Sequence, residues 1–555
     1  MKATMIKLTV VRKNRYFDSV FLMQVARRIS GEPGISDASA LLATPANKKV
    51  LADLGYGKGA EDKDFADAGP NDLLIALEGE EAAVRTVASD PEAWLQRPAS
   101  ASPGTGAGAG AGAKAGAEAG SAREPKSIRA ATEVRPDSTV AVISVPGQHA
   151  AREARAALER GLDVFLFSSN VSVEDELALK DAARDQGLIV MGPDCGTAYL
   201  CGAGIGFANA VRRGPIGIVA SSGTGMQELS CLIHAAGSGI SHGIGTGSRD
   251  LSDAIGGIST LTAVDALEAD PATKVIVILS KPPGRRATGS LMERLAKCAK
   301  PVILCLLGAA AVSAAGSAVG PAPGPAGGVI TTSLIDDAVE AALREAGHPG
   351  FAKSQRSADT LTAMAAAEVS KMRPGQRFVR GLFAGGTFCY QSQAIFNRAG
   401  LVVHSNSPLA GMKELADPTA SVESSFVDMG AEVFVEGRPH PMIDATLRRR
   451  RLEEEGKDAA VAVILLDFIL GAISSRDPVG DLVGTVRAVQ EMAARRGDHL
   501  CFVASVCGTD HDAQGLAAQN DALTDAGVFV FPSNAQAAAF CREIALLLAA
   551  RKEKP

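Results

Sequence analysis

The chain has 555 residues, of which 46% are apolar and 21% are charged. This length is more than one hydrophobic core serves, and it predicts three or four domains. The formal charge of -6, from 56 Lys and Arg against 62 Asp and Glu, offers no basic surface for a phosphate backbone. We therefore expect no binding to nucleic acid.

The cysteines and the apolar runs indicate a protein of a reducing compartment. None of the nine cysteines forms a CxxC pair, and most lie within apolar segments, so we expect reduced core thiols and no metal centre. The first residues alternate apolar and polar side chains, unlike a signal peptide. The longest apolar run, Ala459 to Leu466, is too short to cross a bilayer. We expect a cytoplasmic protein with no membrane association.

Residues 1–96 show strand and helix patterns in alternation. The pattern predicts strands at 6–11, 35–44 and 72–76 with helices at 18–29 and 47–54. We expect a small α+β module of the ferredoxin-like kind. Residues 97–127 are rich in Gly, Ala and Ser, which leave nothing to bury, and are predicted to be a linker.

The rest of the chain predicts an α/β protein with consecutive doubly wound, mainly parallel sheets. Short β-branched runs that alternate with amphipathic helices are typical of parallel strands buried on both faces. The strands predicted in this way are residues 139–145, 164–167, 189–191, 216–220, 275–279, 302–306, 330–332, 378–383, 461–466, 500–504 and 528–531. They divide into a Rossmann-like domain at 128–212 and a flavodoxin-like domain at 213–347. A spacer at 348–374 precedes a second flavodoxin-like domain at 375–551. The two flavodoxin-like domains repeat one internal order, which suggests a duplication.

Two glycine-rich turns follow buried strands and begin helices. The first contains Ser222, Gly223, Thr224 and Gly225. The second contains Gly385, Gly386 and Thr387. Unpaired N–H groups at a helix start carry partial positive charge, so these turns predict phosphate or other anion sites. The alternative is an ordinary Ser or Thr cap with tight-turn glycines.

Two further turns follow strands of the Rossmann-like domain. They contain Gly147 with Gln148, and Asp194 with Cys195. Ligands of open α/β sheets bind at the carboxyl ends of strands, so these residues are candidate contacts to substrate or CoA. No GxGxxG or GxxxxGK[ST] motif occurs, which speaks against a nicotinamide cofactor and a P-loop kinase.

The loop from Arg438 to Asp444 is the main candidate for catalysis. It places Arg438, His440 and Asp444 among prolines, a set suited to binding a planar acid and moving a proton. The alternative is a Pro-rich loop in which His440 and Asp444 bond only to the backbone. Asp510 and His511 follow another strand and could contact substrate, or could form a solvated turn. His234 and His242 are expected to be structural.

The order of these turns resembles a known family more specifically than any one turn does. The similar segments are GPDCG, GPIGIVASSGTGMQE, GIGTGSRDLSD, ALEADPATKVIVIL and KPVILCLLG. They resemble the α chain of succinyl-CoA synthetase, whereas residues 426–430, 464–471 and 522–531 resemble the C-terminal domain of its β chain. Both halves lie on one polypeptide. With residues 14–20 and 437–444, this fusion resembles the FdrA proteins over nearly the whole chain outside the linker.

The departures from the synthetase concern phosphate chemistry. The synthetase carries phosphate on a histidine, but the corresponding stretch here, residues 305–317, contains no histidine. We therefore expect no phosphohistidine. The glutamate that would steady it is replaced by a segment with Lys281, which could pair with a substrate anion or be an exposed structural lysine. The spacer is too small for an ATP-grasp domain.

The resemblance to FdrA implies a component of oxamate carbamoyltransferase that acts in ureide (allantoin) breakdown with separate partner subunits. Its substrates would be small anions, namely carbamoyl phosphate and oxamate. One alternative is an acyl-CoA synthetase that retains CoA and borrows a nucleotide-binding partner. Another is a regulatory subunit that binds CoA or a nucleotide without turnover.

Overall fold

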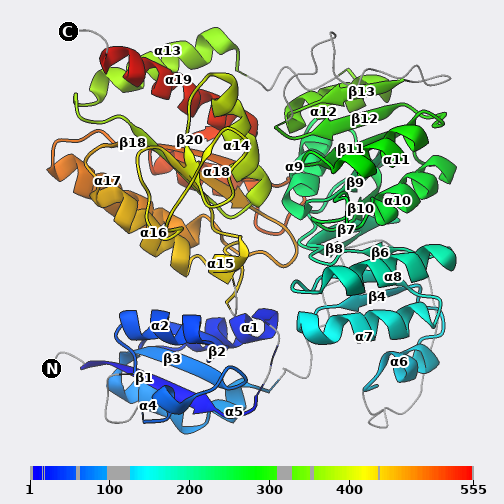
Figure 1. Ribbon diagram of the computed structural model, residues 1–555. Helices are drawn as coiled ribbons and strands as arrows, with labels where there is room; N and C mark the ends of the chain where they lie inside the picture. Colours follow the sequence, from blue (N-terminus) through cyan, green and yellow to red (C-terminus); the bar gives the residue numbers. More distant parts are fainter. Residues whose placement is uncertain are drawn as a thin grey trace, which may run out of the picture. The chain divides into compact units, whose positions relative to one another are not determined.

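The computed structural model describes residues 4–15, 17, 19–57, 63–96, 125–308, 328–349, 356–435 and 438–552 (Figure 1). Most of the predicted linker and most of the histidine-free stretch 305–317 lie outside the described residues. The chain divides into two compact units. The first is Met1–Asp137 with Glu436–Pro439, and the second is Ser138–Val435 with His440–Pro555.

The first unit contains an antiparallel sheet of strand order β1-β3-β2. Its strands are β1 (Met5–Arg12), β2 (Ile35–Leu42) and β3 (Leu73–Glu80). The helices are α1 (Ser19–Ser30), α2 (Pro45–Asp53), α3 (Lys63–Asp67), α4 (Glu81–Ser89), α5 (Pro91–Trp94) and α6 (Ile128–Val134). Apolar residues of β2 and β3 alternate toward α1 and α4 and form one core. The predicted α+β module is confirmed.

The second unit begins with a three-stranded parallel sheet of order β4-β5-β6. The strands are β4 (Val140–Ile143), β5 (Asp163–Leu166) and β6 (Val190–Met191), and the helices are α7 (Gly147–Leu158) and α8 (Val173–Asp185). A hairpin of β7 (Thr197–Leu200) and β8 (Ala203–Gly206) follows. The hairpin joins the next sheet, although it lies before the boundary predicted at residue 212.

A seven-stranded sheet of order β13-β12-β11-β9-β10-β7-β8 forms the first ligase-like lobe. Its parallel strands are β9 (Arg213–Ala220), β10 (Ile240–Gly245), β11 (Val275–Ser280), β12 (Val302–Leu306) and β13 (Val329–Thr332). Helices α9 (Gly223–Ala235) and α12 (Ile335–Glu345) cover one face, and α10 (Ile258–Ala269) and α11 (Arg285–Leu295) cover the other (Figure 1). Every residue of β11 and β12 is buried, as expected for parallel strands between helix layers.

The second ligase-like lobe has a seven-stranded parallel sheet of order β16-β15-β17-β14-β18-β19-β20. Its strands are β14 (Phe378–Phe383), β15 (His404–Ser405), β16 (Lys413–Glu414), β17 (Ser425–Asp428), β18 (Val461–Ile469), β19 (Cys501–Cys507) and β20 (Phe529–Phe531). The helices are α13 (Ala358–Lys371), α14 (Gly386–Arg398), α15 (Glu432–Val435), α16 (Thr446–Lys457), α17 (Gly480–Arg495), α18 (Leu516–Asp525) and α19 (Asn534–Lys552). Half of the predicted spacer is α13, which packs on α19.

The two lobes repeat one strand order. In the first lobe β10 lies on one side of β9, and β11, β12 and β13 follow on the other side. In the second lobe β17 lies on one side of β14, and β18, β19 and β20 follow on the other. Helices α9 and α14, which follow these first strands, pack against each other. The predicted class of doubly wound, mainly parallel sheets is therefore confirmed, and the repeat sets the two glycine-rich turns in corresponding places.

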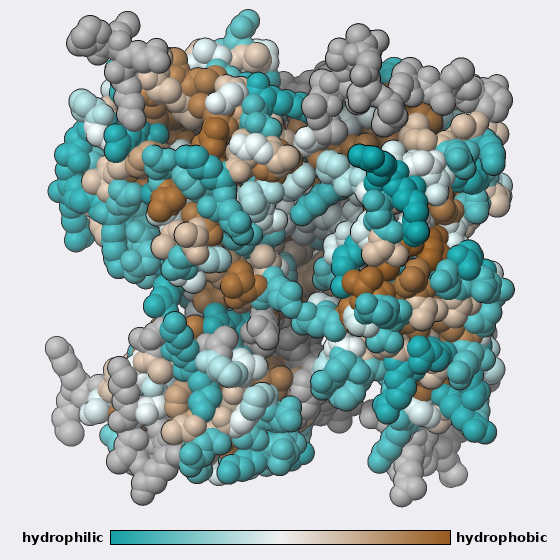
Figure 2. All heavy atoms as spheres, viewed as in Figure 1, coloured by the Kyte–Doolittle hydropathy of each residue, from teal (hydrophilic) through white to brown (hydrophobic). Residues whose placement is uncertain are grey.

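The face shown in Figure 2 is mainly hydrophilic, with apolar side chains in small separate groups. In the described part of the chain, no helix is long and apolar enough to cross a membrane.

Candidate functional site

The start of α9 is fixed by its own cap. Ser222 has extended backbone angles, and its Oγ accepts a hydrogen bond of 3.3 Å from the N–H of Gly225. The capping alternative is therefore present in the structure. It uses one N–H group only, and the N–H groups of Gly223 and Thr224 have no partner among the described residues.

The start of α14 is fixed by a buried carboxylate from the neighbouring strand. Asp467 of β18 accepts the N–H groups of Ala384 at 2.8 Å and Gly385 at 2.7 Å. Arg448 of α16 donates to Asp467 at 2.9 Å and to the carbonyl of Leu382 at 3.0 Å. This buried pair holds the turn that begins α14 in place.

The two helix starts meet. The hydroxyl groups of Ser222 and Thr387 are hydrogen-bonded to each other. A Cβ built on Gly225 would lie 3.2 Å from Thr387 Cγ2 and 2.6 Å from Leu279 Cδ2, so only glycine allows this approach. We call this place, defined by Ser222–Gly225 and Gly385–Thr387, the helix-start site. It combines two helix N-termini, which favours an anion.

Lys281 and Asp428 flank the helix-start site. Lys281 follows β11, and its Nζ lies 4.7 Å from the ring centre of Tyr390 on α14. Asp428 ends β17. A Cβ built on Gly386 would lie 2.6 Å from Oδ2 of Asp428. Burial raises the pKa of Asp428 to about 6, against the opposing effect of the Lys281 cation. Such a carboxyl group can accept a proton near neutral pH.

Asp428 is a candidate that the sequence analysis did not single out. Its only signal was its position at the end of a buried strand, in the segment from Phe426 to Gly430. The sequence alone did not show that Asp428 lies close to Gly386, because Asp428 ends β17 whereas the first turn of α14 follows β14.

Strand β7 of the first lobe, which follows the Rossmann-like sheet in the chain, also reaches the helix-start site. A Cβ on Gly223 would lie 3.2 Å from Oγ1 of Thr197, just after the turn with Asp194 and Cys195. Thr197 is buried, and its hydroxyl has no hydrogen-bond partner in the described residues. An unpaired buried hydroxyl costs free energy, so this group is suited to meeting a ligand.

The other predicted contacts of this sheet line its carboxyl edge. Gly147 begins α7 against the carbonyls of Ser169 and Asn170, and Gln148 lies 3.3 Å from His149. Burial raises the pKa of the Asp194 carboxyl, whose Oδ2 accepts from Ser248 at 3.4 Å. Burial also raises the pKa of the Cys195 thiol to about 12, so this thiol is not a nucleophile at neutral pH.

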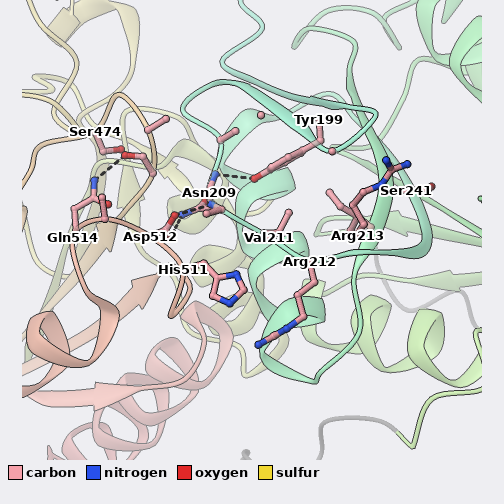
Figure 3. Close-up of a pocket in the computed structure, with 18 of the residues that line it drawn as sticks. Tyr199, Asn209, Val211, Arg212, Arg213, Ser241, Ser474, His511, Asp512 and Gln514 are labelled. Carbon is pink, nitrogen blue, oxygen red and sulfur yellow. Dashed lines mark hydrogen bonds between the residues drawn. The ribbon is translucent and has the colours of Figure 1, made fainter. Parts of the chain in front are cut away.

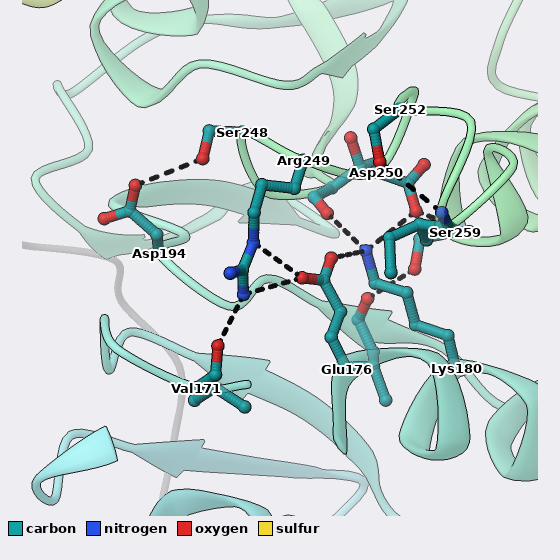
Figure 4. A network of polar contacts seen from close by, with 12 residues as sticks. Val171, Glu176, Lys180, Asp194, Ser248, Arg249, Asp250, Ser252 and Ser259 are labelled. Atoms are coloured by element: carbon teal, nitrogen blue, oxygen red, sulfur yellow. Dashed lines mark hydrogen bonds and ion pairs between the residues drawn. The ribbon is translucent and has the colours of Figure 1, made fainter. Parts of the chain in front are cut away.

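A buried ionic network fixes this edge to the first lobe (Figure 4). Lys180 donates to Glu176 at 2.8 Å, to Asp250 at 2.7 Å and to the carbonyl of Thr246 at 3.0 Å. Arg249 also binds Glu176, at 2.9 Å. All three N–H donors of Lys180 are used in these bonds, which indicates a structural role.

The residues of the predicted Arg438–His440–Asp444 set fall in two places. Arg438 belongs to the first unit, where its Nε donates to Asn47 at 2.8 Å. His440 and Asp444 belong to the second unit. Asp444 accepts the N–H of Thr446 at 2.7 Å at the start of α16, which is the backbone role that the sequence left open.

His440 lies beside the turn that begins α14. A Cβ on Gly430 would be 2.7 Å from both His440 Nε2 and the carbonyl of Ala384. His440 Nδ1 accepts the N–H of Met442 at 3.2 Å, so the ring proton is on Nε2. Burial, with a smaller effect of Arg448, lowers the pKa of His440 to about 4. At neutral pH His440 is therefore a hydrogen-bond donor rather than a base.

Asp510 and His511 lie at the last turn of α9, away from its start. His234 donates from Nε2 to Asp510 at 2.5 Å, and its Nδ1 accepts the N–H of Arg212 at 3.1 Å. The ring of His511 meets that of His234 edge-on at 4.8 Å. These three residues are close enough to hold a metal ion, but both nitrogens of His234 are already used. The arrangement is a structural histidine that orients an exposed carboxylate.

Comparison with known proteins agrees with this architecture. The chain is 41% identical over 536 residues to uncharacterized protein YahF of Escherichia coli K12, covering 96% of this chain and 98% of that protein. The chain belongs to the YahF family. It is also 30% identical over 186 residues to subunit alpha-2 of a mitochondrial ADP-forming succinate–CoA ligase of Trichomonas vaginalis, covering 32% of this chain and 59% of that subunit.

Two family models match parts of this YahF-family chain. Residues 382–544 match the CoA-ligase model, and residues 5–111 match a model described as "AllF, heavy metal-associated domain". Among solved structures, an acetyl-coenzyme A synthetase 1 of Candidatus Korarchaeum cryptofilum is 18% identical, with a TM-score of 0.26, over 75% of this chain and 83% of that chain.

The heavy-metal description does not fit the residues of the first unit. Soft and borderline metal ions are bound chiefly by thiolate and imidazole groups. Residues 5–111 contain no cysteine and no histidine, since the first of each is Cys195 and His149. The match therefore supports the fold of the module and assigns no metal to it.

Proposed function

We propose that this YahF-family chain is an FdrA-type subunit of a carbamoyl- or acyl-transfer enzyme, and that its reaction is carbamoyl transfer between carbamoyl phosphate and oxamate. The observation that carries the proposal is the hydrogen bond between Ser222 and Thr387, which joins two helix N-termini. The coarser activity, an enzyme of the acyl-CoA synthetase superfamily, is indicated by the CoA-ligase domain. The description AllF for the first module agrees with a role in ureide breakdown.

The phosphate of carbamoyl phosphate would bind at the helix-start site. The N–H groups of Gly223, Thr224, Gly386 and Thr387 have no partner among the described residues, and Lys281 adds a positive charge. Together they would stabilise the dianion that leaves when the carbonyl carbon is attacked. Such stabilisation needs no phosphoenzyme, and residues 243–347 contain no histidine.

The proton of the reaction has a candidate acceptor. The amide nitrogen of oxamate attacks the carbonyl carbon, the bond from that carbon to the phosphate oxygen breaks, and the nitrogen loses a proton. Asp428, with a pKa of about 6 beside Gly386, is suited to take it. His440, protonated on Nε2, would donate a hydrogen bond beside Ala384 rather than move the proton.

A second candidate is an acyl-CoA synthetase that works with a nucleotide-binding partner. It is favoured by the CoA-ligase match and by the approach of Gly223 to Thr197, which begins β7 just after the turn that ends the Rossmann-like sheet. In this case CoA would lie along the carboxyl edge of the Rossmann-like sheet, beside Gly147 and Asp194. Because residues 305–317 contain no histidine, phosphate would have to be transferred without a phosphohistidine there.

Titration calorimetry of the full chain tests the proposal. We expect saturable binding of carbamoyl phosphate, with a loss of up to about tenfold in Thr387→Val, because this change removes the hydroxyl bond to Ser222 that joins the two helix starts. Thr362→Val, an exposed threonine of α13, is the matched control and should bind like the wild type.

Turnover separates the candidates. Consumption of carbamoyl phosphate and oxamate by the chain with its partner subunits would support carbamoyl transfer. A thioester that forms only with CoA and ATP would support the second. If Thr387→Val binds carbamoyl phosphate as tightly as the wild type, the helix-start site is not where the phosphate lies.

A further inference from the structure

A cavity lies between the two lobes, beside the later turns of α9. Its volume is about 670 Å³, within the range of sites for small metabolites. Residues 208–213 and Ser241 line one side, and Gly471, Ser474, Arg476 and residues 511–514 line the other (Figure 3). We call it the interlobe pocket.

The walls of the interlobe pocket are held by a carboxylate whose oxygens already accept hydrogen bonds from the protein. Asp512 accepts hydrogen bonds of 2.8 Å from Asn209 Nδ2, from the N–H of Ala210 and from the N–H of Thr509. Gln514 donates to the carbonyls of Gly471 at 2.8 Å and Ser475 at 3.0 Å. The negative charge of Asp512 is therefore used by the protein itself, and the loops around the pocket are preorganised.

Apart from Asp512, the charged side chains that line the pocket are Arg212, Arg213 and Arg476. Arg212 pairs with Asp510 at 3.6 Å. Arg212 donates to the carbonyl of His234 at 2.6 Å, and Arg213 donates to that of Cys201 at 3.2 Å. Arg476 is exposed and has no ion-pair partner in the described part of the chain. Arginine presents several N–H donors in one plane, which suits a carboxylate or a phosphate.

One buried hydroxyl in the pocket wall has no partner. Ser474 is 8% exposed, and its Oγ makes no hydrogen bond with any described residue. Its neighbour Ser475, by contrast, donates to Asp481. Leaving a buried hydroxyl unpaired costs about 1 to 3 kcal/mol. A ligand in the pocket would remove this cost.

We propose that the interlobe pocket binds an organic anion of metabolite size, with a carboxylate or phosphate group at Arg476 and a polar group at Ser474. This site is separate from the helix-start site, which lies at the first turn of α9, and does not depend on the function proposed there. Its position between loops of both lobes means that the ligand would contact the two halves of the enzyme at once.

The test is titration calorimetry of the full chain with citrate, inorganic phosphate and AMP as probes. We expect at least one probe to bind saturably, and Arg476→Gln to weaken that binding about tenfold, the loss of one charged hydrogen bond. Binding of citrate alone would identify the group as carboxylate, whereas binding of AMP or phosphate would identify it as phosphate. Arg487→Gln, an exposed arginine of α17, is the matched control.

Ser474→Ala separates binding from folding. Because it removes an unpaired hydroxyl, we expect its melting temperature to equal or exceed that of the wild type while the affinity falls severalfold. Thr387→Val should leave binding in the interlobe pocket unchanged. The proposal is overturned if none of the three probes binds, if Arg476→Gln and Ser474→Ala leave every affinity within about twofold of wild type, or if only Thr387→Val removes the binding.

Discussion

Glu228 of α9 accepts a hydrogen bond of 2.9 Å from the backbone N–H of Asn534, the first residue of α19. The contact joins the helix after the first strand of one lobe to the last helix of the other lobe. Glu228 is buried, and this burial raises the pKa of its carboxyl to about 8, although the bond from Asn534 opposes the shift.

The Glu228 carboxyl should make the stability of the second unit depend on pH. Its folded-state pKa lies above the unfolded value of 4.5, so the folded state holds the proton more tightly between these two values. Stability should therefore fall as the pH rises from about 5 to 8. Glu228→Gln keeps the acceptor oxygen and removes the charge, so we expect it to raise the free energy of unfolding at pH 8.5 by up to about 5 kcal/mol.

Denaturant unfolding at pH 5.5 and pH 8.5 measures this effect. The matched control is Glu491→Gln on α17, an exposed residue paired with Arg495 at 3.6 Å, which should change stability little at either pH. An equal effect of Glu228→Gln at both pH values would show that the carboxyl does not titrate in this range.

The Asp467–Arg448 pair should be more important to the fold than any exposed ion pair. Asp467→Asn leaves Arg448 buried without its counter-charge and weakens the acceptor for Ala384 and Gly385. We expect a loss of about 3 to 5 kcal/mol. The double variant Asp467→Leu with Arg448→Met should recover part of that loss. Lys457→Met, which breaks an exposed pair with Glu454, should cost less than about 1 kcal/mol in the same unfolding experiment.

The buried parallel strands could be predicted because their sequences are continuous apolar runs. Residues 378–383 coincide with β14, and the predicted strand at 275–279 differs from β11 by one residue. The predicted set omitted β10, whose sequence is interrupted by polar residues and glycine, and β17, which has only two apolar residues. The predicted set also omitted the β7–β8 hairpin, because its antiparallel pairing to β10 is a tertiary contact without a local signal.

The candidate site could be predicted in its parts but not in its assembly. A Ser–Gly–Thr turn after a strand identified the start of α9, and the same logic identified the start of α14. The hydrogen bond from Ser222 to Thr387 spans 165 residues, and no local pattern encodes it. Arg438 and His440 were grouped because they are neighbours in the chain, yet they fall in different units.

The approach of the two helix starts should tolerate no added methyl group at Gly225. Gly225→Ala would place its Cβ 2.6 Å from Leu279 Cδ2 and 3.2 Å from Thr387 Cγ2, so these side chains must shift and the contact between the two helix starts changes. We expect a greater than tenfold loss of carbamoyl phosphate affinity. Gly484→Ala on α17 is the matched control, since nothing lies within 4 Å of the added atom, and it should stabilise the helix by about 0.5 to 1 kcal/mol. Unchanged binding by Gly225→Ala would contradict a tight helix-start site.

Lys281 should set the pH range in which Asp428 accepts a proton. The Lys281 cation favours the ionised carboxylate, so Lys281→Met removes an effect that lowers the pKa of Asp428. We expect this pKa to move above about 6, and the acid limb of the pH–rate profile to move to higher pH with it. A 13C NMR titration of labelled aspartates, with Asp428→Asn to assign the signal, measures the shift without turnover. Lys274→Met, an exposed lysine before β11, serves as control and should leave the titration unchanged. An unchanged titration of Asp428 in Lys281→Met would mean that Lys281 does not face this carboxyl group.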